Sequence, residues 1–162
     1  MNVARLAAAL LGCAAATAQA APEVMAFELP RLDASRFVTL NEFGGRPVLV
    51  NFWGSDCPPC VHEMPLLDVQ RQQHPALQFI GVAVDERSQA LAFLQRHPVG
   101  MLQLLAPLQP AALLRRFGNR LGVLPYTVVL DAGLRICKAQ AGEIDATWID
   151  AAARACASEA TP

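Results

Sequence analysis

The sequence is poor in charge, in aromatic side chains and in closely spaced metal ligands. Charged residues make up 17% of the 162 residues and aromatic residues 6%, and the net charge is only −1. No run of lysine and arginine is present, which argues against a nucleic-acid binding surface. No internal repeat occurs, which argues against a solenoid. The length is that of one domain with a substantial hydrophobic core.

The five cysteines include a single closely spaced pair, Cys57 and Cys60. A structural zinc site needs four ligands, usually supplied as two such pairs, so one pair argues against a bound metal. Haem attachment requires a histidine directly after the second cysteine, where this chain has Val61. A purely structural role is also disfavoured, because such a short loop constrains little of the unfolded chain. Redox chemistry of the cysteines themselves, with no cofactor, is the remaining interpretation.

The cysteine pair follows an apolar, β-branched run, residues 48–53, which is typical of a buried parallel strand. A helical pattern begins at the pair, and the intervening prolines suit a first helical turn, where a missing N–H costs little. The free N–H groups and the dipole of a helix start favour a negative charge at the first cysteine. Cys57 is therefore predicted to be the attacking thiolate, and Cys60 the resolving thiol one turn later.

Strands and helices alternate along the chain, which predicts an α/β domain with a mixed sheet between layers of helices. Residues 21–36 are expected to be an extended lead-in, and residues 37–160 to form the domain. The helix after Cys60 should continue to about His74, with a kink at Pro65. Further elements are predicted at 37–40, 77–84, 89–97 (capped by Ser88), 101–105, 110–117, 126–130, 134–139 and 145–157.

The N-terminus has the pattern of a secretory signal peptide. One positive charge, an apolar stretch from Leu6 to Ala16 and a small-residue site ending at Ala20 predict cleavage there, giving a periplasmic protein. Alternatively, the sequence before Cys13 resembles a lipoprotein box, which would anchor the chain through that cysteine. Both alternatives place the domain outside the cytoplasm, where disulfides persist.

A second motif lies 62 residues after the resolving cysteine, from Gly122 to Thr127, with Pro125 directly before an apolar strand. Together with the run from Val50 to Pro65, it resembles the TlpA/ResA-like thiol:disulfide oxidoreductases of the thioredoxin superfamily. The resemblance extends from about Phe37 to Cys156. It implies a thioredoxin-like fold with a mixed central sheet flanked by helices, and a helix–strand insertion before the proline.

The resemblance also assigns roles to residues around the cysteines. Pro125 would be a cis-proline that faces the pair, and its neighbouring backbone would bind an extended substrate segment. The residues expected at the substrate contact are Trp53, Pro58, Leu124 and Pro125, although Trp53 could instead pack beneath the site and shield the thiolate.

Glu63 matches a glutamate of the ResA-like helix, and Asn51 stands where cytoplasmic thioredoxins carry a buried aspartate. Asn51 cannot take up a proton, whereas Glu63, one turn after Cys60, could relay protons if it were buried. A solvated helix glutamate is the alternative. His62 is expected to be an exposed helix residue.

Two further cysteines, Cys137 and Cys156, fall in the predicted hairpin and the last helix. In an oxidising compartment they could form a structural disulfide, if their Cα atoms lie within ~4.4–6.8 Å. They could equally be buried free thiols, which behave as small hydrophobic residues.

The sequence therefore predicts an extracytoplasmic thiol:disulfide oxidoreductase, most readily a reductase. By resemblance, its partners would be disulfide-containing envelope proteins such as cytochrome c maturation components, with a membrane-bound thiol donor to recharge it. The chain is expected to be a monomer that binds no nucleic acid. A disulfide-forming oxidase and a copper-holding chaperone that uses the same two thiols are the alternatives, together with an inert interaction module of the same fold.

Overall fold

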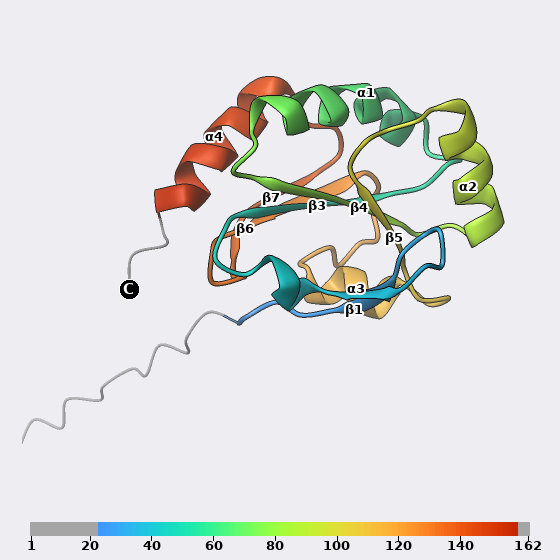
Figure 1. The fold of residues 1–162 in the computed structure, drawn as a ribbon, viewed down its shortest axis with the longest axis horizontal. Coiled ribbons are helices and arrows are strands. Elements are labelled where there is room, and N and C mark those ends of the chain that lie inside the picture. Colours follow the sequence, from blue (N-terminus) through green and yellow to red (C-terminus); the bar gives the residue numbers. More distant parts are fainter. Residues whose placement is uncertain (1–22, 159–162) are drawn as a thin grey trace, which may run out of the picture.

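The computed structural model describes residues 23–158, which form a mixed five-stranded sheet between two layers (Figure 1). The strand order is β5-β4-β3-β6-β7, with β3, β4 and β5 parallel and β6 and β7 antiparallel to their neighbours. The strands are β3 (Val48–Trp53), β4 (Gln78–Ala83), β5 (Leu102–Leu105), β6 (Tyr126–Leu130) and β7 (Ile136–Ala141). This mixed sheet, flanked by helices, is the thioredoxin-like fold that the sequence predicted.

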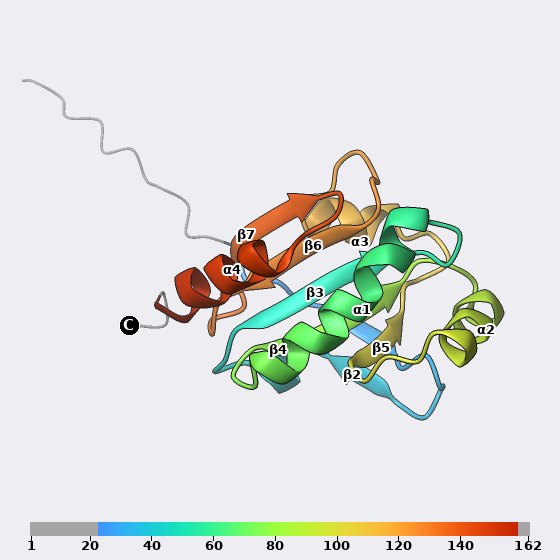
Figure 2. The same ribbon diagram turned by 90° about the horizontal axis from the view of Figure 1, so that it is seen from above.

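Helices connect the parallel strands, as such crossovers require. Helix α1 (Pro58–Gln73) joins β3 to β4, α2 (Arg87–Arg96) joins β4 to β5, α3 (Ala111–Arg116) precedes β6, and α4 (Ala146–Ser158) ends the described chain. Figure 2 shows α1 lying across the face of β3 and β4, beside α4. The α2–β5 unit occupies the position predicted for the insertion before Pro125. No helix within residues 23–158 is long and apolar enough to cross a membrane.

Alternate residues of β3 face the two layers. Val48, Val50 and Phe52 pack on the side of α3, whereas Leu49 and Trp53 pack on the side of α1. All six β3 side chains are buried, because helices or strands cover both faces of this central strand. This burial on both faces explains the apolar run at residues 48–53, in which Asn51 is the one polar residue.

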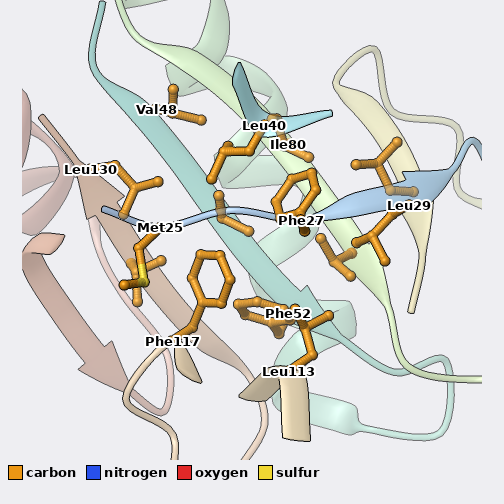
Figure 3. Close-up of a cluster of buried hydrophobic side chains, with 14 of the residues drawn as sticks. Met25, Phe27, Leu29, Leu40, Val48, Phe52, Ile80, Leu113, Phe117 and Leu130 are labelled. Atoms are coloured by element: carbon orange, nitrogen blue, oxygen red, sulfur yellow. The ribbon is translucent and has the colours of Figure 1, made fainter. Parts of the chain in front are cut away.

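The segment expected to be an extended lead-in contributes to the core. It contains β1 (Glu28–Pro30), which pairs antiparallel with β2 (Phe37–Thr39), and the 3-10 helix η1 (Leu40–Phe43) follows. Met25, Phe27 and Leu29 are buried in the cluster that also contains Phe52 and Phe117 (Figure 3). The hydrophobic core therefore begins before residue 37.

Two elements, α2 and β7, start two residues away from the predicted position. Helix α2 begins at Arg87 with Glu86 as its extended N-cap residue, so Ser88 lies in the first turn and does not cap the helix. Arg87 Nη1 donates to the carbonyls of Arg31 and Leu32, which ties the start of α2 to the segment before β2. Strand β7 starts and ends two residues later than predicted because a turn, with Leu134 at positive φ, precedes it.

The strand register brings four connections to one edge of the sheet. Trp53 at the end of β3 pairs with Ala83 at the end of β4, and Phe52 pairs with Tyr126 at the start of β6. Tyr126 in turn pairs with Ala141 at the end of β7. The segments that follow β3, β4 and β7, and the one that precedes β6, therefore surround a common site.

Candidate active site

Cys57 and Cys60 form a disulfide at the start of α1. The sulfurs are 2.07 Å apart and the Cα atoms 5.3 Å apart. Cys57 is the N-cap residue of α1, and its Sγ accepts a hydrogen bond from the backbone N–H of Cys60 at 3.3 Å. Cys57 is half-buried, whereas Cys60 is only 1% exposed. Only the first sulfur is therefore within reach of another molecule, and the helix start directs an N–H group at it.

Side chains from β3 and from the segment after β4 hold the turn before the disulfide in place. The carboxylate of Asp85, just after β4, accepts a hydrogen bond from the backbone N–H of Ser55. Trp53 is 1% exposed, and its indole N–H donates to Gln103 Oε1 at 3.0 Å. Gln103 reaches under β4 because Gly81 has no side chain; a Cβ there would collide with the Gln103 amide. Trp53 therefore packs beneath the turn and does not reach the surface, which is the second of the two roles that the sequence allowed for it.

The proline motif lies beside the disulfide. The Leu124–Pro125 peptide bond is cis, and Pro125 is buried. Leu124 is half-buried and packs against both core clusters. The Asn119 side chain shapes this loop, because its amide donates to the carbonyl of Val123 and its oxygen accepts from the N–H of Val123. Pro58 is exposed, so Pro58 and Leu124 present apolar surface next to the reactive sulfur.

Glu63 is buried, with 2% of its surface exposed. One carboxylate oxygen accepts a hydrogen bond from Asn51 Nδ2 at 2.6 Å, and the other accepts from the backbone N–H of Ile144 at 3.0 Å. Asn51 Nδ2 also donates to Thr127 Oγ1 at 3.0 Å, and within residues 23–158 its Oδ1 has no partner. His62, by contrast, is exposed and bonded to Glu143. Glu63 is thus held between β3, α1 and the β7–α4 connection.

Burial raises the pKa of Glu63 to about 7 from its ordinary 4.5. The hydrogen bonds from Ile144 and Asn51 act in the opposite direction, and the neighbouring charge of Glu143 adds to the increase. Asp131, the other buried carboxylate in the described residues, lies at the far end of β6 and is bonded to the N–H of Arg135. Within residues 23–158, Glu63 is therefore the buried carboxyl group at this edge of the sheet, and its pKa lies near neutral pH.

A Glu63→Gln variant is expected to gain stability at pH 8 and little at pH 4. Because the folded pKa lies above the unfolded one, ionisation costs the wild type stability as the pH rises from about 4.5 through about 7. The full shift corresponds to ~3 kcal/mol, an upper bound for the gain. Urea unfolding at both pH values measures it, with exposed Glu28→Gln as the control. An equal difference at both pH values would contradict the buried, titrating carboxyl.

Cys137 and Cys156 form a second disulfide that joins β7 to α4, with the Cα atoms 5.7 Å apart. Cys156 is fully buried and Cys137 is half-buried. This arrangement is the first of the two alternatives that the sequence left open.

Several groups at the site escaped sequence reasoning. The backbone N–H groups of Ile144 and Gly142 donate to Glu63 and to the carbonyl of Pro125, and such contacts leave no mark on residue type. The role of Asn51 in holding Glu63 could have been inferred, since the two residues lie on the facing surfaces of β3 and α1. Asp85 could have been noticed as a carboxylate directly after a predicted buried strand.

The Redoxin family profile matches residues 16–155. The thiol-disulfide oxidoreductase ResA of Halalkalibacterium halodurans is 27% identical over 124 residues, which cover 75% of this chain and 56% of that protein. The chain thus matches little more than half the length of that relative.

Solved structures show the same fold. A thioredoxin-related protein from Neisseria meningitidis serogroup B superposes with a TM-score of 0.70 at 26% identity, covering 81% of this chain and 99% of the other. A thiol:disulfide interchange protein of the thioredoxin family from Chlorobium tepidum has a TM-score of 0.73 at 19% identity, covering 86% and 99%. The resemblance inferred from the two motifs is confirmed, and the chain belongs to the Redoxin family, as a ResA-like member of the thioredoxin superfamily.

Proposed function

We propose that the protein is a thiol:disulfide oxidoreductase that reduces disulfides of other proteins through Cys57 and Cys60. The observation that carries this proposal is the asymmetric disulfide at the start of α1, with a reachable Cys57 sulfur and a buried Cys60 sulfur. A redox pair of this kind needs one sulfur to meet the partner and a second one to release it. The family relationship supports the same activity.

The reaction begins with the reduced form of the protein. The Cys57 thiolate attacks one sulfur of the partner disulfide, forming a mixed disulfide and releasing the other partner sulfur as a thiolate, which takes a proton from water. Cys60 then loses its proton and attacks Cys57 Sγ, which displaces the second partner thiolate. The partner gains two electrons, and the pair returns to the disulfide seen in the structure.

Glu63 takes the proton from Cys60 in this mechanism. It lies one helical turn from Cys60, and its pKa of about 7 suits proton exchange near neutral pH. Once protonated, its O–H needs an acceptor, and a half-turn of the Asn51 amide would present the unpartnered Oδ1 to it. The N–H of Ile144 keeps its hydrogen bond with the other oxygen throughout.

The partner segment binds across the exposed apolar surface of Pro58 and Leu124, beside Pro125. The exposed side chains of Val123 and Leu121, which are 41% and 89% exposed, extend this surface along the same loop. An extended peptide next to the Leu124 backbone would bring its disulfide to Cys57.

The proposed location is outside the cytoplasm. Two observations support it: the disulfide between Cys137 and Cys156, which an oxidising compartment preserves, and the signal-like pattern of residues 1–20. Those residues, and Cys13 with its lipid-anchor alternative, lie outside the described part of the chain. The proposed partners are disulfide-containing envelope proteins, with cytochrome c maturation components among the candidates, and a membrane-bound thiol donor.

A Cys60→Ser variant tests the activity and identifies the partners. It is expected to stop at the mixed disulfide, since no second thiol can release the partner, and to accumulate covalent complexes in the native envelope. Non-reducing electrophoresis would show these adducts, and dithiothreitol should release the partner proteins by reducing the mixed disulfide. A Cys57→Ser/Cys60→Ser variant provides the control and should trap nothing. Equal adduct levels in both variants would contradict the proposal.

The redox potential decides the direction of electron flow. We expect a value near the ~−270 mV of thioredoxin, which suits a reductase, whereas a value near ~−120 mV would indicate an oxidase. Equilibration of Cys57 and Cys60 with a glutathione or thioredoxin couple, followed by alkylation of free thiols, measures it.

A further inference from the structure

Three consecutive residues between β7 and α4 contact both the loop that contains Pro125 and helix α1, which carries Glu63 and His62. The backbone N–H of Gly142 donates to the carbonyl of Pro125 at 2.9 Å, and that of Ile144 donates to Glu63 at 3.0 Å. Glu143, between them, is bonded to His62 at 3.2 Å. The tripeptide 142–144 therefore joins the cis-proline loop to α1, and its position fixes where the Glu63 carboxylate lies.

Apart from the buried Ile144 side chain and the pairing of β7 with β6, few noncovalent contacts hold the tripeptide in place from its own side. Strand β7 is the outermost strand of the sheet and its side chains are mostly exposed. Helix α4 is rich in alanine, and Ile149 is its large aliphatic side chain that is fully buried. The outer contacts of this unit include a hydrogen bond between His74 and Asp150 and a cation–π contact of Lys138 with Trp148, both partly exposed and therefore weak.

The second disulfide closes the unit that carries the tripeptide. Strand β7 and helix α4 are the two arms that lead to and from the tripeptide. Cys137 lies near the start of β7 and Cys156 in the last turn of α4, so the disulfide joins the two arms at the end opposite the tripeptide. The β7 arm from Cys137 to Gly142 spans ~17 Å at ~3.4 Å per residue. The α4 arm from Asp145 to Cys156 spans ~16 Å at ~1.5 Å per residue. Arms of equal length joined at the far end leave the tripeptide little freedom to slide.

We propose that the Cys137–Cys156 disulfide positions the active site, by holding the tripeptide 142–144 against Pro125 and Glu63. The two cysteines are positioning residues, since neither one contacts the reacting sulfurs. The inference rests on the proposed thiol–disulfide exchange only for its effect on rate, because the contacts of the tripeptide are structural.

Amide hydrogen exchange tests the positioning directly, without any assay of activity. In a Cys137→Ala/Cys156→Ala variant, the N–H groups of Gly142 and Ile144 are expected to exchange about tenfold faster or more, because their hydrogen bonds open when the arms can slide. The control is Val38→Ala, a fully buried β2 residue on the opposite face, which lowers global stability without contacting the tripeptide. Unchanged exchange at both amides, or acceleration no greater than in the control, would overturn the proposal.

The pH profile of insulin reduction tests the consequence for chemistry. Loosening the tripeptide admits water to Glu63, and because burial is the main cause of its raised pKa, the inflection near pH 7 should move toward 4.5. Glu143, with His62 bonded to it, is the charged group that faces Glu63 from the β7–α4 connection, whereas β3 and β6 present neutral Asn51 and Thr127.

A double-mutant cycle separates this effect from a general loss of activity. In a Glu63→Gln background, removal of the second disulfide should no longer shift the profile, and an equal shift in both backgrounds would overturn the positioning role. If Glu63→Gln alone leaves the profile unchanged, the proton-transfer role of Glu63 in the proposed function fails. In that case the amide exchange rates of Gly142 and Ile144 still test whether the Cys137–Cys156 disulfide positions the tripeptide.

Discussion

A Cys57→Ser variant is expected to reduce insulin no faster than the dithiol donor does without protein. Serine cannot form the mixed disulfide, and at neutral pH its hydroxyl is not ionised, so the only reachable nucleophile of the pair is lost. The buried Cys60 cannot take its place, since its side chain is 1% exposed. Insulin turbidity at pH 7, with dithiothreitol as the donor, measures the rate.

A matched substitution on the same helix distinguishes loss of chemistry from damage to α1. Val69 is 50% exposed and lies on the outer side of α1, away from the pair, so Val69→Ser should keep the wild-type rate. Residual turnover by Cys57→Ser above the donor background would mean that another thiol attacks the substrate.

A chain that starts at Phe37 is expected not to fold. It would lack Met25, Phe27, Leu29 and Leu32, all of which are buried in the described structure. Burial of a large apolar side chain contributes about 1.5–3 kcal/mol, so four of them approach the ~5–15 kcal/mol that stabilises a typical domain. Circular dichroism and urea unfolding would show the loss, and a chain that starts at Glu23 should unfold cooperatively.

A point substitution tests the contribution of the segment before β2 without removing that segment. Phe27 packs against Phe117, with ring centroids 6.1 Å apart (Figure 3). Phe27→Ala should therefore lower the free energy of unfolding by about 3–5 kcal/mol. A change below ~1 kcal/mol would show that the segment before β2 is dispensable.

The parts of the fold that the sequence predicted are those with strong local signals. The apolar run of β3, the cysteine pair at a helix start and the apolar β6 strand each follow from a pattern within a few residues. The contribution of the segment 23–36 was not predicted, because Pro22 directly before it and Pro30 within it indicate breaks in regular structure. Met25, Phe27 and Leu29 nevertheless alternate with exposed residues, which is the period of a half-buried strand.

The candidate site was predicted only as far as side-chain chemistry reveals it. Cys57, Cys60 and Pro125 stand in recognisable motifs, and Glu63 was left between two interpretations because its burial depends on a loop 81 residues away. Trp53 was left between a substrate contact and a packing role, and its indole turns inward to Gln103. Contacts made by the backbone of residues 142–144 carry no residue preference, so no inspection of the sequence alone could have found them.

The missing side chain of Gly81 has a wider consequence. Because Gly81 lies in β4, between β3 and β5, the side-chain amide of Gln103 on β5 can cross the face of β4. It thereby reaches the indole of Trp53, which packs beneath the turn before Cys57. Changes on β5, the outer strand that carries Gln103, can thereby alter the support of the turn that leads to Cys57. A substitution of Gln103 is therefore expected to change the reactivity of Cys57 while the cysteine motif itself stays the same.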